Sequence, residues 1–192
     1  AGVACDEKSA SRLFSLGVKD CKIVSDKDVL KMKDEICSAA LAVSVLALTP
    51  KMYNYRYNQL KAAGQNLNHL LSSGHAAALT GVIGKCPSCG YALVDRFAVH
   101  NDITQRIHEK YPAVKVVQMP KAEADIAVAA ASVLARAEFL RIMAELEAQA
   151  GMPLPKGGSD AATSCAHMIA EKFGKESLAN FVKLHFANYK RI

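Results

Sequence analysis

Three acidic residues in the middle of the chain have positions that could support metal chemistry. Asp95 directly follows an apolar strand expected over residues 91–94, and ligands collect at the carboxyl ends of strands in open α/β sheets. Glu123 and Asp125 stand at the start of a long Ala-rich helix expected over residues 124–150. Hard cations such as Mg²⁺ and Mn²⁺ prefer oxygen ligands and often take one or two carboxylates plus a substrate phosphate. The three acids are therefore candidate ligands for either ion.

Each of these acids also has a structural interpretation. Asp95 could cap the turn after its strand, and its position alone slightly favours that role. Acidic residues at a helix start are stabilised by capping and by the helix dipole, so Glu123 and Asp125 could serve the helix only. The residues by themselves leave both interpretations open.

The elements that must position these acids alternate between helices and strands. Ser9 and Ser25 are expected to cap the first two helices, and Pro50 ends a Val- and Leu-rich segment that favours a buried strand. We expect helices at residues 9–16, 27–38, 66–83, 102–110, 124–150, 160–173 and 177–188, and strands at residues 1–5, 41–49, 91–94 and 114–117. This alternation predicts an α/β domain. Because Pro and Gly make residues 152–158 a loop, we expect a core over residues 1–151 and a C-terminal helical extension of the same domain over residues 152–192.

Composition narrows the class of protein. The 192 residues are 51% hydrophobic and 22% charged, enough to bury one substantial core. No apolar run reaches the roughly 18 residues of a membrane span, and no signal-peptide pattern is visible, so we expect a soluble, cytoplasmic monomer without a membrane partner. Six scattered cysteines indicate free thiols, and the Cys86–Cys89 pair lacks the further ligands of a zinc site. The net charge of +6 is compatible with a polyanionic partner but does not identify one.

Five short segments, in the same order along the chain, resemble ribonuclease HIII, a member of the type 2 ribonuclease H family. They are Gly17-Val18-Lys19-Asp20-Cys21-Lys22, Asn66-Leu67-Asn68 with Gly74-His75, Val94-Asp95-Arg96-Phe97, the Lys-Ala-Glu and Ala-Ala-Ser stretch of residues 121–136, and Lys183-Leu184-His185-Phe186-Ala187-Asn188. Any one of them could arise by chance, but five in order could hardly do so. The resemblance implies a ribonuclease H-like mixed sheet flanked by helices, with C-terminal helices.

The resemblance also implies an activity. Members of the family are endonucleases that cut the RNA strand of RNA–DNA hybrids, use two Mg²⁺ or Mn²⁺ ions and leave 5′-phosphate ends. Asp95 matches the third of four metal-binding acids; for the fourth we favour Asp125, with Glu123 a close second. The first two acids belong to a Gly-x-Asp-Glu strand that should precede Ala1, so we expect the chain alone to be impaired. Alternatives are a non-catalytic hybrid-binding module and a ribonuclease HII-like enzyme.

Other residues are expected to contact substrate by the same resemblance. His185 could instead be a hydrogen-bonded core histidine, which we favour, and Lys22 could be an ordinary exposed lysine. Tyr53, Tyr55 and Tyr57 could stack on bases or sugars, although packing of one tyrosine face is the favoured interpretation. The expected substrate contacts are Asp20, Lys22, Asn66, Asn68, Lys156, Gly157, Lys183, His185 and Asn188.

Overall fold

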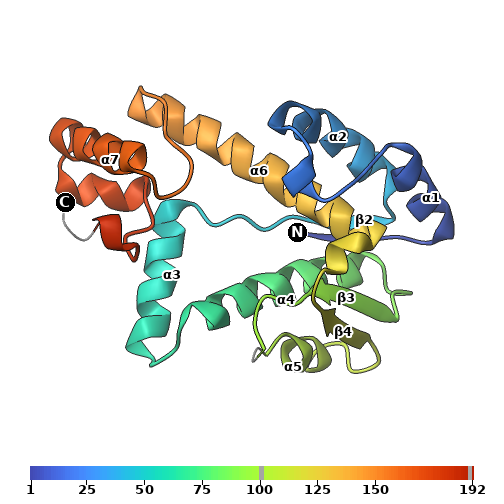
Figure 1. Ribbon diagram of the computed structural model, residues 1–192. Coiled ribbons are helices and arrows are strands. Elements are labelled where there is room, and N and C mark those ends of the chain that lie inside the picture. Colours follow the sequence, from blue (N-terminus) through green and yellow to red (C-terminus); the bar gives the residue numbers. More distant parts are fainter. Residues whose placement is uncertain (100–101, 190–191) are drawn as a thin grey trace. The chain divides into compact units, whose positions relative to one another are not determined.

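The computed structural model describes residues 1–99, 102–189 and 192, with the side chain of Asn188 left out. The chain forms two compact units, which are described separately (Figure 1). Unit 1 comprises Ala1–Leu46 and Leu67–Phe139, and unit 2 comprises Ala47–Asn66 and Leu140–Ile192. The long helix α6 (Ile126–Ala150) begins in unit 1 and ends in unit 2.

The strands of unit 1 form two pairs. β1 (Gly2–Ala4) pairs antiparallel with β2 (Ala42–Ser44), and β3 (Tyr91–Asp95) pairs parallel with β4 (Lys115–Met119). Both pairing directions therefore occur, and the predicted α/β class is confirmed. The long strand expected over residues 41–49 was wrong: only three residues pair, and Thr49 already caps the next helix.

Helices cover these strands within unit 1. They are α1 (Glu7–Ser15), α2 (Asp26–Ala39), α4 (Leu67–Lys85), α5 (Ile103–His108) and the first half of α6, with 3-10 turns η1 (Cys21–Ile23) and η2 (Ala122–Ala124). Ile83 of α4, Val94 of β3 and Ile107 of α5 share one buried cluster, so the strand that ends in Asp95 packs against both helices. Such burial of apolar side chains is the main stabilising contribution to this half of the fold.

The caps of the first two helices show what local sequence can specify. Ser25 caps α2 as predicted, by accepting a hydrogen bond from the Asp28 N–H at 3.2 Å. The cap of α1 is Asp6 and not Ser9; Ser9 is the third helical residue and completes a reciprocal capping box with Asp6. The first helix therefore starts two residues earlier than expected, because the acid takes the capping position.

Unit 2 consists of helices. They are α3 (Pro50–Ala62), the end of α6, α7 (Asp160–Phe173), η3 (Lys175–Asn180) and η4 (Ala187–Tyr189). α7 has the predicted bounds, whereas the regular helix expected over residues 177–188 was wrong. Asn54 of α3 explains the difference: its side chain bonds the backbone of Ala179, Val182 and Leu184, so backbone groups there are satisfied by a side chain instead of by helical hydrogen bonds.

Two expectations about the whole chain can be compared with the structure. All six cysteines are free thiols, as predicted. No helix in the described ranges is both long and apolar enough to cross a membrane.

Candidate active site

Asp95 lies at the carboxyl end of β3, where its side chain is fixed to the segment after β4. Its Oδ1 accepts a hydrogen bond from the Ala122 N–H at 3.2 Å, and the next residue, Arg96, donates its N–H to the Met119 carbonyl at 3.0 Å. Lys121, between β4 and η2, has a left-handed backbone with φ of 58°. This turn directs the chain so that η2 begins beside the half-buried Asp95 carboxylate.

Glu123, in η2, carries a carboxylate that is only partly satisfied. Its side chain is 26% exposed, and its Oε1 lies 3.8 Å from the Lys22 ammonium. Its Oε2 is buried and has no hydrogen-bond partner in the described part of the chain. Leaving a charged oxygen buried without a partner is costly, so this atom is suited to accept a cation or a donor from a ligand.

Lys22 lies among three carboxylates. Its ammonium is 3.6 Å from Asp20 Oδ2 and is itself 72% exposed. Asp20 first, Glu123 second and Asp95 to a smaller extent raise the pKa of Lys22, while slight burial acts against them. The ammonium is therefore fully protonated at neutral pH and lies on the solvent-exposed side of the three carboxylates.

The loop that carries Lys22 is anchored at several points. Asp20 accepts a hydrogen bond from the Lys22 N–H at 3.2 Å, and the Cys21 N–H donates to Ser132 Oγ at 3.0 Å. On the same face of α6, Arg136 forms an ion pair with Asp26 of α2 at 2.8 Å. Because Cys21 is held through its backbone N–H, this anchor does not depend on its side chain.

Asp125 has a different role from Glu123 in the structure. Its Oδ1 accepts hydrogen bonds from the N–H groups of Ala127 at 2.8 Å and Val128 at 3.3 Å, which is the geometry of a helix cap. Its charge also acts on Cys5, whose thiol pKa is raised mainly by burial. The helix-capping interpretation thus holds for Asp125, and its predicted role as a metal ligand is untested.

His75 is a neighbour of the site that sequence reasoning did not select. Its half-buried ring stacks on Phe97 with centroids 5.1 Å apart and planes 17° apart. Burial is the largest cause that lowers the pKa of His75, and the Asp95 carboxylate acts in the opposite direction. The Gly74-His75 pair, which lies in a predicted helix and contributes to the family resemblance, is the sequence feature that could have pointed to His75.

In unit 2, Lys183 and His185 come together around Tyr53. The Lys183 ammonium lies 4.6 Å from the centre of the Tyr53 ring, and the Tyr53 hydroxyl lies 3.3 Å from His185 Nδ1. Tyr53 is 6% exposed and stacks on Tyr57 at 6.0 Å, whereas Tyr55 is 58% exposed. One tyrosine face therefore packs inward, which is the interpretation that the sequence favoured. His185 is half-buried and hydrogen-bonded, which agrees with the expectation of a core histidine.

The remaining predicted contacts lie elsewhere. Lys156 and Gly157 lie in an exposed turn of unit 2, where Gly157 has φ of 88°. Asn66 and Asn68, on either side of the unit boundary, are exposed at the start of α4. The side chain of Asn188 lies outside the described residues.

The acids around Lys22 offer oxygen donors of the kind that a divalent ion binds. Over the residues with described positions, no three His, Cys, Asp or Glu side chains are close enough to hold a metal. Asp95 and Glu123 nevertheless act on the same ammonium, and the unpartnered Glu123 Oε2 is the hard oxygen donor that Mg²⁺ or Mn²⁺ prefers. The two acids fit such an ion as part of its ligand set.

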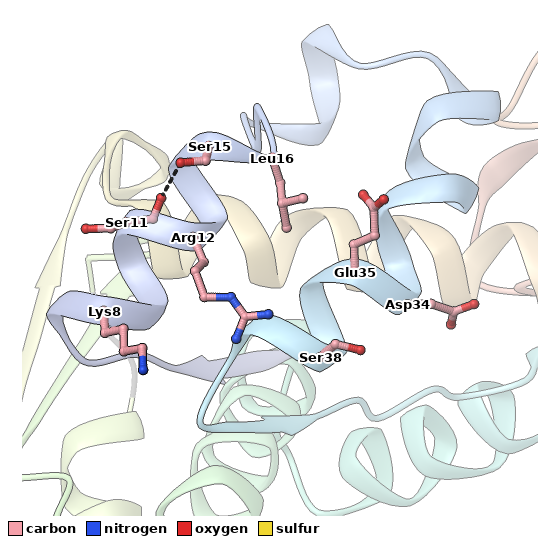
Figure 2. A pocket seen from close by; sticks show the side chains of 8 residues that line it. All are labelled: Lys8, Ser11, Arg12, Ser15, Leu16, Asp34, Glu35 and Ser38. Atoms are coloured by element: carbon pink, nitrogen blue, oxygen red, sulfur yellow. Dashed lines mark hydrogen bonds between the residues drawn. The ribbon is translucent and has the colours of Figure 1, made fainter.

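A separate hollow of about 810 Å³ opens between α1 and α2 (Figure 2). Cations of α1 and acids of α2 line it, together with serine hydroxyls. None of the predicted site residues belongs to it. Its lining residues are Lys8, Ser11, Arg12, Ser15, Leu16, Asp34, Glu35 and Ser38.

Comparison with known proteins agrees with this fold. The family model described as Ribonuclease HII matches residues 1–189, so the chain belongs to the ribonuclease HII family. Within this family, the chain is similar to proteins named ribonuclease HIII. The protein of Protochlamydia amoebophila is 36% identical over 186 residues, which are 97% of this chain and 60% of the relative. The protein of Chlamydia caviae is 33% identical over 194 residues, which are 100% of this chain and 63% of the relative. The resemblance inferred from the five segments is thereby confirmed.

Solved structures support the same conclusion. A crystal structure of Bst-RNase HIII in complex with Mn²⁺ matches with a TM-score of 0.85 and 27% identity, covering 97% of this chain and 60% of that chain. The ribonuclease H2 of Pyrococcus horikoshii shares the fold, with a TM-score of 0.76 and 22% identity, over 97% of this chain and 84% of that chain. The predicted ribonuclease H-like fold is confirmed, and the chain spans about three fifths of the length of the ribonuclease HIII relatives.

Proposed function

We propose that this chain is the catalytic core of an endonuclease that hydrolyses the RNA strand of RNA–DNA hybrids with Mg²⁺ or Mn²⁺. One observation carries the proposal: Asp95 and Glu123, in a chain of the ribonuclease HII family, act on one ammonium beside a buried carboxylate oxygen that has no partner among the described residues. The Mn²⁺ in the similar Bst-RNase HIII structure supports a divalent ion of this kind. The products are a 5′-phosphate and a 3′-hydroxyl.

Some residues of the chain hold the metal, and another binds the phosphate. When bound, the metal supplies activation of the attacking water and stabilisation of the leaving oxygen. Asp95 and Glu123 hold it, and Asp125 is the alternative to Glu123. Lys22 stays protonated because of its acidic neighbours, so it can bind the scissile phosphate once that anion competes with Asp20 and Glu123.

Further acids and contacts belong to the same proposal. Two further acids, those of the Gly-x-Asp-Glu segment that the resemblance implies, complete the metal-binding set. Asn66, Asn68, Lys156, Gly157, Lys183, His185 and Asn188 are proposed substrate contacts outside the metal site. A cytoplasmic location is supported by the six free thiols, which suit a reducing compartment.

Cleavage of a labelled RNA–DNA hybrid tests the proposal. The assay uses the chain alone and a version extended ahead of Ala1 by the Gly-x-Asp-Glu-x-Gly-x-Gly-Asp segment, with Mg²⁺, Mn²⁺ or EDTA. We expect metal-dependent cutting by the extended version, and a fall of at least about 100-fold in Asp95→Asn because a ligand charge is lost. Asp34→Asn, an exposed acid of α2, is the matched control and should cut normally.

Two results would contradict the proposal. Cleavage by Asp95→Asn at the unaltered rate would remove Asp95 from the site. Tight hybrid binding without any cutting by the extended version would support the alternative, a non-catalytic binding module.

A further inference from the structure

One sequence motif of unit 1 has no part in the proposed metal site. Cys86-Pro87-Ser88-Cys89 joins the end of α4 to the segment before β3, and the other four cysteines lie far from one another in sequence. A Cys-x-x-Cys spacing is typical of a metal site, which needs further ligands, or of a thiol pair that can be oxidised. Among the described residues, no three His, Cys, Asp or Glu side chains are close enough to hold a metal, which favours the thiol pair.

The backbone holds the two cysteines at the ends of a closed turn. The Cys89 N–H donates to the Cys86 carbonyl at 3.0 Å, and Pro87 occupies the second position, where its fixed φ favours a turn. The first and fourth Cα atoms of a β-turn lie within about 7 Å of each other. Disulfides join Cα atoms about 4.4–6.8 Å apart, so the backbone of this turn is compatible with a bridge.

Each thiol has its own surroundings in the reduced chain. The Cys86 sulfur lies 3.6 Å from the Ser88 hydroxyl, and the Cys89 thiol donates to the Tyr91 carbonyl at 3.3 Å. Both side chains are half-buried, at the edges of two different apolar clusters. Because neither side chain is enclosed, rotation about the Cα–Cβ bonds can turn the sulfurs toward each other, and a small reagent can reach them.

We propose that Cys86 and Cys89 form a reversible disulfide by exchange with a small-molecule disulfide of the glutathione type. One cysteine thiolate attacks a sulfur of oxidised glutathione, which forms a mixed disulfide and releases one glutathione thiol. The second cysteine thiolate attacks the protein sulfur of the mixed disulfide, so the Cys86–Cys89 bond forms and the second glutathione leaves as a thiol. The protein loses two electrons and two protons, and the glutathione disulfide gains them.

The bridge changes the contacts at the start of β3. It joins the residue after α4 to the segment that enters β3, the strand that ends in Asp95. Oxidation also removes the proton that the Cys89 thiol donates to the carbonyl of Tyr91, the first residue of this strand. Disulfide exchange at this pair does not depend on the proposed function, because both sulfurs belong to the chain itself.

Mass spectrometry of one tryptic peptide tests the pair. Cleavage after Lys85 and after Arg96 releases residues 86–96, which contain both cysteines of the motif and no other. The folded chain is incubated with mixtures of reduced and oxidised glutathione, quenched with acid, alkylated and digested. We expect this peptide to lose two hydrogens at an oxidant concentration at which less than about a tenth of Cys37 carries glutathione, and dithiothreitol to restore both thiols. Cys37 is the matched control because it is an exposed thiol.

Single substitutions separate the two exchange steps. Cys86→Ser and Cys89→Ser each keep one thiol of the pair, so the first step can occur and the second cannot. We expect each variant to accumulate the mixed glutathione disulfide at its remaining cysteine, at least about fivefold above the level in the parent chain. Cys37→Ser should leave oxidation of the pair unchanged. Circular dichroism verifies folding, and the titration of the parent chain remains the test if a serine variant does not fold.

Two outcomes would overturn the proposed disulfide. One is a peptide 86–96 that keeps both thiols, or carries two glutathiones without a bridge, at oxidant concentrations that modify Cys37. The other is a bridge from Cys86 or Cys89 to a different cysteine, within the chain or in a second copy, because the turn would then not determine the partner.

Discussion

Glu123→Gln and Asp125→Asn remove the same charge from two acids that are two residues apart, and the structure separates their effects. Within the part of the chain that the structure describes, Glu123 has a buried oxygen without a partner, and it lies beside the ammonium that Asp95 also influences. Asp125 uses its carboxylate to cap α6. We therefore expect Glu123→Gln to weaken Mn²⁺ binding and hybrid cleavage, and Asp125→Asn to leave both unchanged.

The size of each effect follows from the local contacts. The Lys22–Glu123 pair is 3.8 Å long and mostly solvated on the lysine side, so its loss should change the unfolding free energy little. Loss of a carboxylate from the metal set should lower Mn²⁺ affinity and cleavage by roughly 10- to 100-fold. Asn caps a helix about as well as Asp, so Asp125→Asn should cost only a few tenths of a kcal/mol, whereas Asp125→Ala should cost about 1 kcal/mol.

Three measurements on the extended protein check this reasoning. Electron paramagnetic resonance gives the fraction of free Mn²⁺, a labelled hybrid gives the cleavage rate, and urea unfolding gives the free energy of unfolding. The reasoning is refuted if Asp125→Asn abolishes cleavage while its unfolding free energy is unchanged and Glu123→Gln cuts normally. In that case the fourth acid would be Asp125, as the sequence resemblance favoured.

Three other changes probe packing and charge. Asn54→Ala should lower the unfolding free energy in urea by about 2–4 kcal/mol, since it leaves two carbonyls and one N–H without their partner; a cost below about 1 kcal/mol would contradict this account. Gly81→Ala should cost about 1–3 kcal/mol because its Cβ would meet a serine hydroxyl 2.3 Å away, whereas Gly74→Ala, in open space on the same helix, should gain up to about 1 kcal/mol; equal shifts in melting temperature would disprove the difference. Arg106 lowers the pKa of Asp102, so this half-buried pair stabilises the fold above the ordinary aspartate pKa and loses that contribution, under about 1 kcal/mol, as pH falls through the lowered value; Arg106→Gln should narrow the gap in stability between pH 7 and pH 3.

Several parts of the fold could be predicted because their causes are local. The apolar stripe and the Ser25 hydroxyl are enough to place α2, and the Ser159 cap with the following small and apolar residues places α7. α3 was missed because its tyrosines, asparagines and single arginine have no clear apolar period. Only Tyr53 and Asn54 of that helix are buried, and what buries them is a segment more than a hundred residues away.

The same distinction between local causes and contacts of distant segments applies to the candidate site. Five short segments, in their order along the chain, determined the family, the strand-end Asp95 and the pair of acids before α6. The sequence could do so because motifs, helix caps and strand ends depend on residues that are neighbours in sequence. Only the tertiary structure shows that Glu123 lies beside the Lys22 ammonium that Asp95 also influences, whereas Asp125 caps α6. The Ala122–Asp95 hydrogen bond and the Lys22–Glu123 contact join segments that are distant in sequence, and a pattern within one segment carries no information about such contacts. The same holds for the aromatic cluster around Tyr53, where the Asn54 side chain of α3 satisfies backbone groups of the distant C-terminal segment.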